Sequence, residues 1–215
     1  MRKIFVTGIG TDVGKTVVAA ILAEALQADY WKPVQSGSEQ GTDRKTVRSL
    51  ISNSKTICHP ESYSLKAFLS PHDAAKKENV IIDAGQIKLP STSNSIVIEG
   101  AGGVFVPLND NYFVIDLIQT LKAEVVLVSK NYLGSINHTL LTIEALKSRG
   151  IQLTGIVFNG NPYPEGELII LSHSGLPEIG RVFQEKEINR SVISRYAKQF
   201  KDRKSTRLNS SHTDI

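Results

Sequence analysis

The sequence is poor in cysteine, since Cys58 is the only one among 215 residues. A lone cysteine excludes an intrachain disulfide and a cysteine-based metal cluster. No apolar run approaches the about 20 residues that a membrane-spanning helix needs. No cleavable apolar leader follows Met1 either, so we expect a cytoplasmic protein with no membrane partner.

A concentrated basic segment is also missing. The formal net charge is +4, but the Lys and Arg residues are scattered and are not interleaved with aromatic residues. Nucleic-acid-binding proteins usually gather these residues on one face or along one helix. We therefore expect no nucleic-acid partner, and we interpret the mild basicity as that of a phosphate-binding enzyme.

The length and an apolar content of 40% are sufficient for one sizeable core, so we expect one domain over residues 1–201. Residues 202–215 differ from the rest because they have no apolar periodicity. They resemble one reading frame of a common sequencing-library adapter. We expect this segment to be a non-native, disordered tail and exclude it from the fold prediction.

A glycine-bearing loop near the start of the chain is the strongest motif. A short apolar run breaks at Gly8, and Gly14, Lys15 and Thr16 then open a helical pattern. In a phosphate-binding loop (P-loop), backbone N–H groups and the helix N-terminus surround the phosphates. Lys15 would add a cation and Thr16 a hydroxyl ligand for Mg²⁺.

The loop is longer than usual, because Gly8 and Gly14 enclose residues 9–13, one residue more than the usual motif. We expect Gly10 and Thr11 to absorb the additional residue. An ordinary strand-to-helix turn is the alternative. The order of strand, loop, Lys-Thr pair and amphipathic helix favours the P-loop.

Two further segments place charged residues after expected strands. Residues 30–34 read as a strand whose end carries Lys32, followed by a polar, glycine-rich loop. Asp43 then precedes a helical segment over 46–51, where it could cap the helix or face a metal ion. Ligands of open α/β sheets bind at the carboxyl ends of the strands, where we expect these residues.

A third expected strand, residues 95–99, ends in Glu99 and is followed by the glycine-rich turn 100–103. A carboxylate in this position, in line with a P-loop, is the usual second anchor for the metal ion of a P-loop NTPase. An acid that merely ends a strand is the alternative. The glycines favour a site because small residues let a ligand approach closely.

The rest of the chain continues the alternation of strands and helices. We expect strands over 125–128, 153–158 and 180–183, helices over 113–121, 135–148, 164–174 and 186–200, and a helix start at 70–75. Residues 79–94 are weakly patterned, and we expect a short helix and a loop there. This alternation predicts an α/β fold: a single-domain P-loop NTPase with a parallel sheet flanked by helices on both faces.

Two helix and strand ends could add ligand contacts. Ser135 is a suitable N-cap, so the amides at 135–138 could hold a carboxylate. Asn159, at the end of a strand and before Gly160, could recognise a purine edge or simply form a turn. From the residues alone, we infer an ATP-dependent enzyme that acts on a small anionic molecule.

Several motifs together resemble the dethiobiotin synthetase family of the biotin pathway. The similarity runs from Lys3 to about Phe200 and rests on residues 6–16, Lys32–Gly37, Ser70–His72, Glu99–Gly103 with Val106–Leu108, and Leu133–His138. It implies an ATP-dependent ligase in which 7,8-diaminononanoate takes up CO₂ as a carbamate. ATP phosphorylates this carbamate, and the second amine closes the ring to give dethiobiotin, ADP and phosphate.

The resemblance also implies roles for individual residues. Lys32, Lys15 and Thr11 would be catalytic, and Thr16, Asp43 and Glu99 would hold Mg²⁺. ATP would be bound by Asp12, Val13, Gly14, Lys15, Thr16, Val17, Asp43, Glu99, Gly100, Ala101, Gly102, Asn159 and Gly160. The diamine end would meet Ser36, Gly103 and Val104, and the substrate carboxylate would meet Ser135, Ile136, Asn137 and His138 of the neighbouring subunit in a homodimer. The adenine-contacting segment of the family is not recognisable after Val182.

The main alternative is a partitioning or positioning ATPase, a switch that acts on a protein or DNA partner. Such proteins typically carry a lysine five residues before the invariant one, whereas this chain has Gly10 there. A glutamine-dependent amide ligase of related fold is a second alternative. It would need an amidotransferase domain with a nucleophilic cysteine, for which the sequence offers no candidate region.

Overall fold

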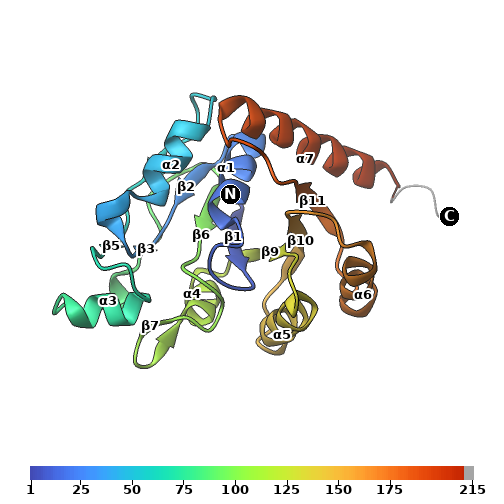
Figure 1. Cartoon of the computed structure of the whole chain (residues 1–215). Helices are drawn as coiled ribbons and strands as arrows, with labels where there is room; N and C mark the ends of the chain where they lie inside the picture. Colours follow the sequence, from blue (N-terminus) through green and yellow to red (C-terminus); the bar gives the residue numbers. More distant parts are fainter. Residues whose placement is uncertain (211–215) are drawn as a thin grey trace.

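The computed structural model describes residues 1–210, with the side chains of residues 1–202. Its centre is a seven-stranded sheet in which each strand runs parallel to its neighbours (Figure 1). The strands, in spatial order, are β11 (Glu178–Val182), β10 (Leu153–Asn159), β9 (Glu124–Lys130), β1 (Lys3–Gly8), β6 (Ile96–Glu99), β2 (Asp29–Trp31) and β4 (Cys58–His59). The predicted α/β class is confirmed.

Helices cover both faces of the sheet (Figure 1). One layer contains α1 (Lys15–Leu26), α2 (Asp43–Leu50) and α7 (Arg190–Ser210). The other contains α3 (Pro71–Lys77), α4 (Val114–Leu121), α5 (Ser135–Ser148) and α6 (Pro164–Ser174). Helix α7 continues into the segment that we expect to be non-native, and residues 211–215 of that segment lie outside the described residues.

The central strands are apolar throughout because both of their faces are buried. In β1, Ile4 and Val6 pack with α1, whereas Phe5 between them packs with α4 on the opposite face. Side chains of a strand alternate between faces, so a strand covered on both sides needs a continuous apolar run. This accounts for the unbroken run before Gly8.

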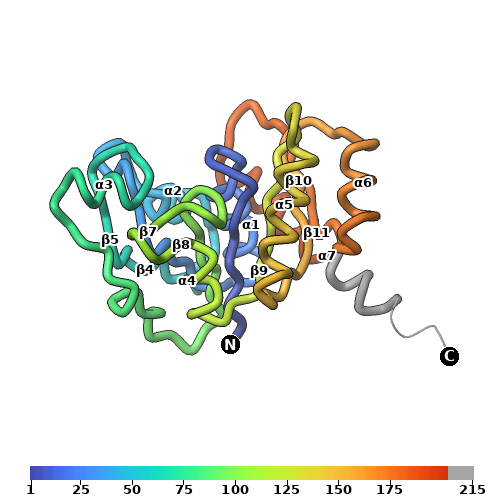
Figure 2. The backbone as a smooth tube through the Cα atoms, turned by 90° about the horizontal axis from the view of Figure 1, so that it is seen from below, coloured from blue at the N-terminus to red at the C-terminus, as the bar shows by residue number. Residues whose placement is uncertain are grey.

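The chain crosses from one side of β1 to the other between β6 and β9. In α/β sheets such a switch point creates a crevice at the carboxyl ends of the strands, where ligands bind. Figure 2 shows the loop after β1 at the end of the sheet opposite to the N-terminus. The P-loop therefore lies at this crevice.

The strand predicted over residues 30–34 is wrong in its extent. The chain leaves the main sheet after β2, and β3 (Val34–Gln35) pairs instead with β5 (Tyr63–Ser64) in a separate two-stranded sheet. Pro33 has no N–H to donate to a ladder, and its carbonyl accepts from the amides of Ser62 and Tyr63 at 2.9 and 3.0 Å. Lys32 thus stands at the bend between two sheets.

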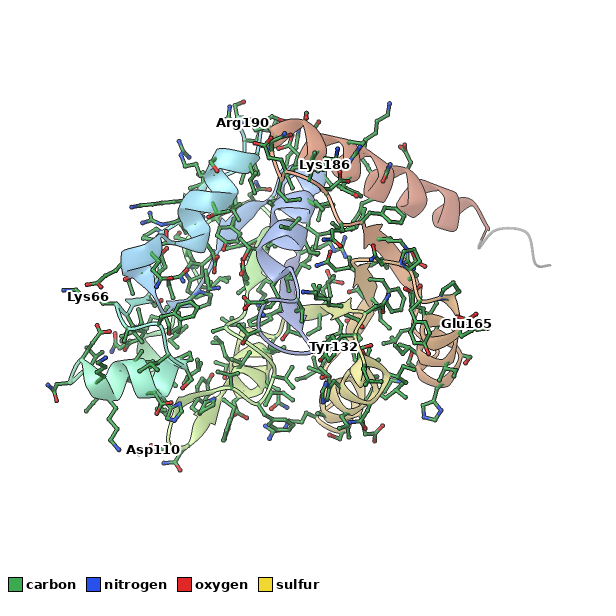
Figure 3. The ribbon with its side chains drawn as sticks, in the orientation of Figure 1. Lys66, Asp110, Tyr132, Glu165, Lys186 and Arg190 are labelled. Carbon is green, nitrogen blue, oxygen red and sulfur yellow. The ribbon has the colours of Figure 1, made fainter. Side chains whose placement is uncertain are left out.

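A second small sheet was also not predicted. It is the antiparallel hairpin of β7 (Pro107–Asn109) and β8 (Tyr112–Phe113), which carries Asp110 at its outer end (Figure 3). Between residues 79 and 94, where we predicted a short helix, the structure has only the 3₁₀ turn η2 (Ala84–Gln86). Another 3₁₀ turn, η1 (Ser38–Gln40), follows β3.

At two helix starts the cap is a different residue from the candidate that the sequence offered. Thr42 caps α2, because its hydroxyl accepts from the Lys45 amide, and Asp43 is the first helical residue. At α5 the cap is Gly134, with φ of 99°, rather than Ser135. The carboxylate of Asp43 is therefore not needed as a cap. In the described part of the chain, no helix combines the length and apolarity required to traverse a membrane.

Candidate active site

The P-loop is held in shape by two left-handed residues and by a contact from β10. Asp12 has φ of 55° and Gly14 has φ of 94°. A side chain at Gly14 would clash with the amide of Asn159, which donates to the Val13 carbonyl at 2.8 Å. Glycine is therefore required here on two grounds, conformation and space.

A compact ionic cluster lies beside this loop. The Thr16 hydroxyl lies 2.8 Å from Glu99 Oε1 and 3.1 Å from Asp43 Oδ1. The Lys32 ammonium donates to the same Glu99 oxygen at 3.1 Å and forms an ion pair with Asp43. The loop after β1, the end of β2, the start of α2 and the end of β6 thus meet at one point, as predicted from the sequence.

The two lysines of the site have opposite pKa shifts. Burial lowers the pKa of Lys15 to about 8, although Glu99 opposes the shift, and its ammonium donates to the Gly10 carbonyl at 2.7 Å. Burial also disfavours the charged form of Lys32, but the carboxylates of Glu99 and Asp43 outweigh it and raise the Lys32 pKa. Lys32 is thus a firmly held cation.

Two residues outside the predicted site residues hold Glu99 and Asp43 in place. The Tyr30 hydroxyl donates to Glu99 Oε2 at 2.8 Å. The Gln35 side chain accepts from the Asp43 amide at 3.0 Å and donates to the Ser36 carbonyl at 2.7 Å. One sequence signal could have indicated Tyr30. It stands two residues before Lys32, on a strand that lies beside the strand ending in Glu99.

A cavity of about 630 Å³ opens beside this cluster. Its polar part is formed by the P-loop and the ionic cluster. The lining also includes Phe68, Leu69, Pro71 and Val106, and the ring of Phe68 lies against Gly37. The cavity is therefore suited to an amphiphilic ligand with an ionic end and an aliphatic part.

Most of the expected site residues line this cavity. They are Thr11, Asp12, Gly14, Lys15, Thr16, Val17, Lys32, Ser36, Asp43, Glu99, Ala101 and Gly102. The expected site residues outside this lining are Val13, Gly100, Gly103, Val104, Asn159, Gly160, Ser135, Ile136, Asn137 and His138. The side chains of Val13 and Val104 belong to the core, so either residue could meet a ligand only through its backbone.

Among the residues that line the cavity, Ser36 has an unusual hydroxyl. It is shielded from solvent and has no hydrogen-bond partner among the described residues. Buried hydroxyls in folded proteins are nearly always paired. Its position in the cavity wall makes a bound molecule a suitable partner.

The start of α5 is a separate surface. Asn137 and His138 are exposed, the ring of His138 is hydrogen-bonded to the Tyr132 hydroxyl at 2.7 Å, and Ser135 is buried. Figure 3 shows Tyr132 on the segment that precedes α5. Leu133 beside it is fully exposed.

Together, the central β1, the P-loop and the carboxylate at the end of β6 define a P-loop NTPase. The fold resembles the cell division ATPase MinD of Pyrococcus furiosus, with a TM-score of 0.60, 14% identity, and coverage of 94% of this chain and 99% of that one. It also resembles a ParA family ATPase from Chlorobium tepidum, with a TM-score of 0.59, 13% identity, and coverage of 91% and 97%. At such low identity the likeness shows the fold alone.

Sequence relatives define the family within this class. A family model described as an AAA domain matches residues 2–192. The chain is 54% identical to the ATP-dependent dethiobiotin synthetase BioD of Cytophaga hutchinsonii, covering 92% of this chain and 96% of the relative. It is 46% identical to the enzyme of the same name from Christiangramia forsetii, covering 94% and 97%. The chain belongs to the dethiobiotin synthetase family.

Proposed function

We propose that this chain is an ATP-dependent dethiobiotin synthetase, a ligase that forms the ureido ring of dethiobiotin from 7,8-diaminononanoate, CO₂ and ATP. The observation that carries this proposal is the meeting of Lys15 and Lys32 at one cavity. Lys15 belongs to the P-loop after β1, and Lys32 follows β2, on the other side of β6, beside the carboxylates. Two such cations suit the transfer of a phosphoryl group to an anionic acceptor.

The nucleotide would bind with its phosphates against the P-loop. The amides of residues 11–16 and the N-terminus of α1 supply donors and a positive dipole end, and Lys15 supplies the cation. Thr11, which lines the cavity, would lie near the reacting phosphoryl group. The residues at the end of β10, Asn159 and Gly160, would contact the base, and Gly100–Gly102 would border the phosphates.

The donor set beside the loop fits Mg²⁺. Thr16, Asp43 and Glu99 offer a hydroxyl and two carboxylates, the hard oxygen ligands that this ion prefers together with phosphate oxygens and water. The ammonium of Lys32 pairs with both carboxylates and offsets one of their two negative charges. When bound, the metal ion would supply charge neutralisation at the transferred phosphoryl group.

The reaction needs a carbamate that attacks a phosphoryl group. One amine of the substrate adds to CO₂ and loses a proton, which gives the carbamate. A carbamate oxygen then takes the terminal phosphoryl group of ATP, and ADP leaves. The second amine attacks the carbamate carbon and expels phosphate, closing the ring. Lys32 would stabilise the negative charge on the carbamate and on its phosphorylated form.

The cavity also suits the shape of this substrate. Ser36 and the backbone of Gly103 and Val104 would meet the diamine end, and the apolar side of the cavity with Phe68 would pack against the alkyl chain. The substrate carboxylate would bind to the backbone amides at Ser135–His138 of a neighbouring subunit, with the exposed Asn137 beside them. The exposed Leu133 next to this helix start supports burial in such a homodimer.

Release of ADP with and without the two substrates tests the proposal. We expect hydrolysis to be slow with ATP alone and to rise many-fold when diaminononanoate and bicarbonate are both added, with dethiobiotin formed in equal amount. Omitting either substrate should return the rate to the ATP-only level. Hydrolysis that responds to DNA instead of the diamine would contradict the proposal.

A further inference from the structure

The hydroxyl of Tyr30 is bonded to a carboxylate of the site from within the core. Tyr30 is 0% exposed and Glu99 is 1% exposed, and the Tyr30 hydroxyl donates to Glu99 Oε2 at 2.8 Å. A tyrosine hydroxyl is protonated at neutral pH and a carboxylate can only accept, so Tyr30 is the donor in this bond.

The register of the sheet produces this contact. Tyr30 on β2 pairs with Val97 on β6, so the side chains of both point to the same face of the sheet. Glu99 stands two residues further along β6 and shares that face. The Tyr30 side chain therefore extends diagonally toward the carboxyl end of the sheet and contacts Glu99 from the core side.

This bond divides the two oxygens of Glu99 between different partners. Oε2 accepts from Tyr30 in the core, whereas Oε1 faces the site, where it accepts from Lys32 at 3.1 Å and lies 2.8 Å from the Thr16 hydroxyl. A carboxylate held by a bond to one oxygen cannot rotate freely. The bond therefore fixes the plane of the carboxylate, so that one oxygen faces the P-loop while the other is held in the core.

We propose that Tyr30 is a positioning residue, which fixes the Glu99 carboxylate so that Oε1 is presented to a divalent cation at Thr16 and Asp43. This inference rests on the proposed magnesium site and adds a residue that hydrogen-bonds to one of the proposed ligands. Outer partners of metal-binding carboxylates orient the ligand, and their loss typically costs about 10–100-fold in metal affinity or activity.

Replacing Tyr30 by Phe tests this role, because the ring remains in the core and only the hydroxyl is lost. A matched control is Tyr196→Phe, which removes a hydroxyl that likewise donates to a carboxylate, that of Glu185, from a buried tyrosine on α7. Both variants should fold with reduced thermal stability, and Tyr196→Phe also loses the bond that its hydroxyl accepts from the Phe183 amide at 3.0 Å. Only Tyr30→Phe should change metal binding.

Binding of Mn²⁺, measured by electron paramagnetic resonance with a non-hydrolysable ATP analogue, gives a readout independent of turnover. We expect Tyr30→Phe to bind Mn²⁺ about 10–100-fold more weakly than the unmodified protein, and Tyr196→Phe to bind it equally well. Equal Mn²⁺ affinity in Tyr30→Phe and the unmodified protein would overturn the inference. So would failure of Tyr30→Phe to fold, because the role would then be structural.

The same titration separates this inference from the proposals beneath it. If the unmodified protein bound no Mn²⁺ with the nucleotide, the metal site itself would be wrong, and the role of Tyr30 with it. Substrate-dependent release of ADP tests the synthetase activity separately. A protein with that activity and with unchanged Mn²⁺ affinity in Tyr30→Phe would refute only the role of Tyr30.

Discussion

Replacing Lys32 by Gln should abolish the synthetase reaction while leaving the nucleotide bound. The Lys32 ammonium lies at the bend after β2, where it contacts both Glu99 and Asp43. Glutamine is one bond shorter and keeps an N–H donor group, but it removes the charge. The phosphates would still meet Lys15 and the P-loop amides, so binding of ATP should change little.

The size of the effect follows from the charge that is lost. A unit charge about 4 Å from an anionic group contributes about 4 kcal/mol at an effective dielectric constant of about 20. If Lys32 contacts the phosphorylated carbamate at such a distance, its loss lowers the rate about 10³-fold. This agrees with the roughly 10²–10³-fold cost of removing one donor at a developing oxyanion.

The assay is release of ADP in the presence of diaminononanoate and bicarbonate, with binding of an ATP analogue measured by calorimetry. Lys130→Gln is the matched control, because Lys130 is exposed at the same end of the sheet and donates to the Asp12 carbonyl at 3.4 Å. It should retain full turnover. Turnover by Lys32→Gln above about a tenth of the unmodified rate would refute the role of Lys32, provided that the variant melts as a folded protein.

Three further substitutions test other parts of the structure. Gly14→Ala should lower ATP affinity at least about tenfold, since left-handed strain costs about 1–3 kcal/mol and the methyl group meets Asn159; calorimetry measures it. Phe68→Ala should raise KM for the diamine about tenfold at unchanged kcat, because one or two methylenes of the substrate, at about 0.8 kcal/mol each, would lose their apolar contact. Steady-state kinetics measures this, and an unchanged KM would contradict it. Hydrogen bonds from His59 and other groups outweigh burial and lower the pKa of Asp29, so its carboxylate stabilises the fold above its unfolded pKa. The unfolding free energy of Asp29→Asn should therefore fall below that of the unmodified protein at neutral pH, with the gap closing as pH drops below about 4; a gap independent of pH would contradict this.

The sequence was sufficient to predict the parts of the site that lie on regular elements. Lys15 and Thr16 open a helix after a buried strand, and Glu99 ends another, so strand order alone brings them to one edge. Asp43 was ambiguous, because an acid before a helix is also a common cap. The structure decides between these two roles, because Thr42 occupies the cap position and leaves the Asp43 carboxylate free of that role.

The parts that were missed depend on contacts between distant segments. The bend at Pro33 and the pairing of β3 with β5 join residues about 30 positions apart, and no local pattern predicts this partner. Tyr30 was counted only as part of an apolar strand, because its hydroxyl acquires a role through the register of β2 against β6. Phe68 lies in a loop, where periodicity carries no information.

The ionic cluster also limits how this part of the chain can evolve. Lys15 and Lys32 together carry the same number of charges as Asp43 and Glu99, with the opposite sign, at the base of one cavity. Replacing any one of the four by a neutral residue leaves an unbalanced charge beside the cavity, which costs stability and disturbs the site. Change here should therefore occur in compensating pairs, and sequences that lose one member of the set should have lost its counterpart as well.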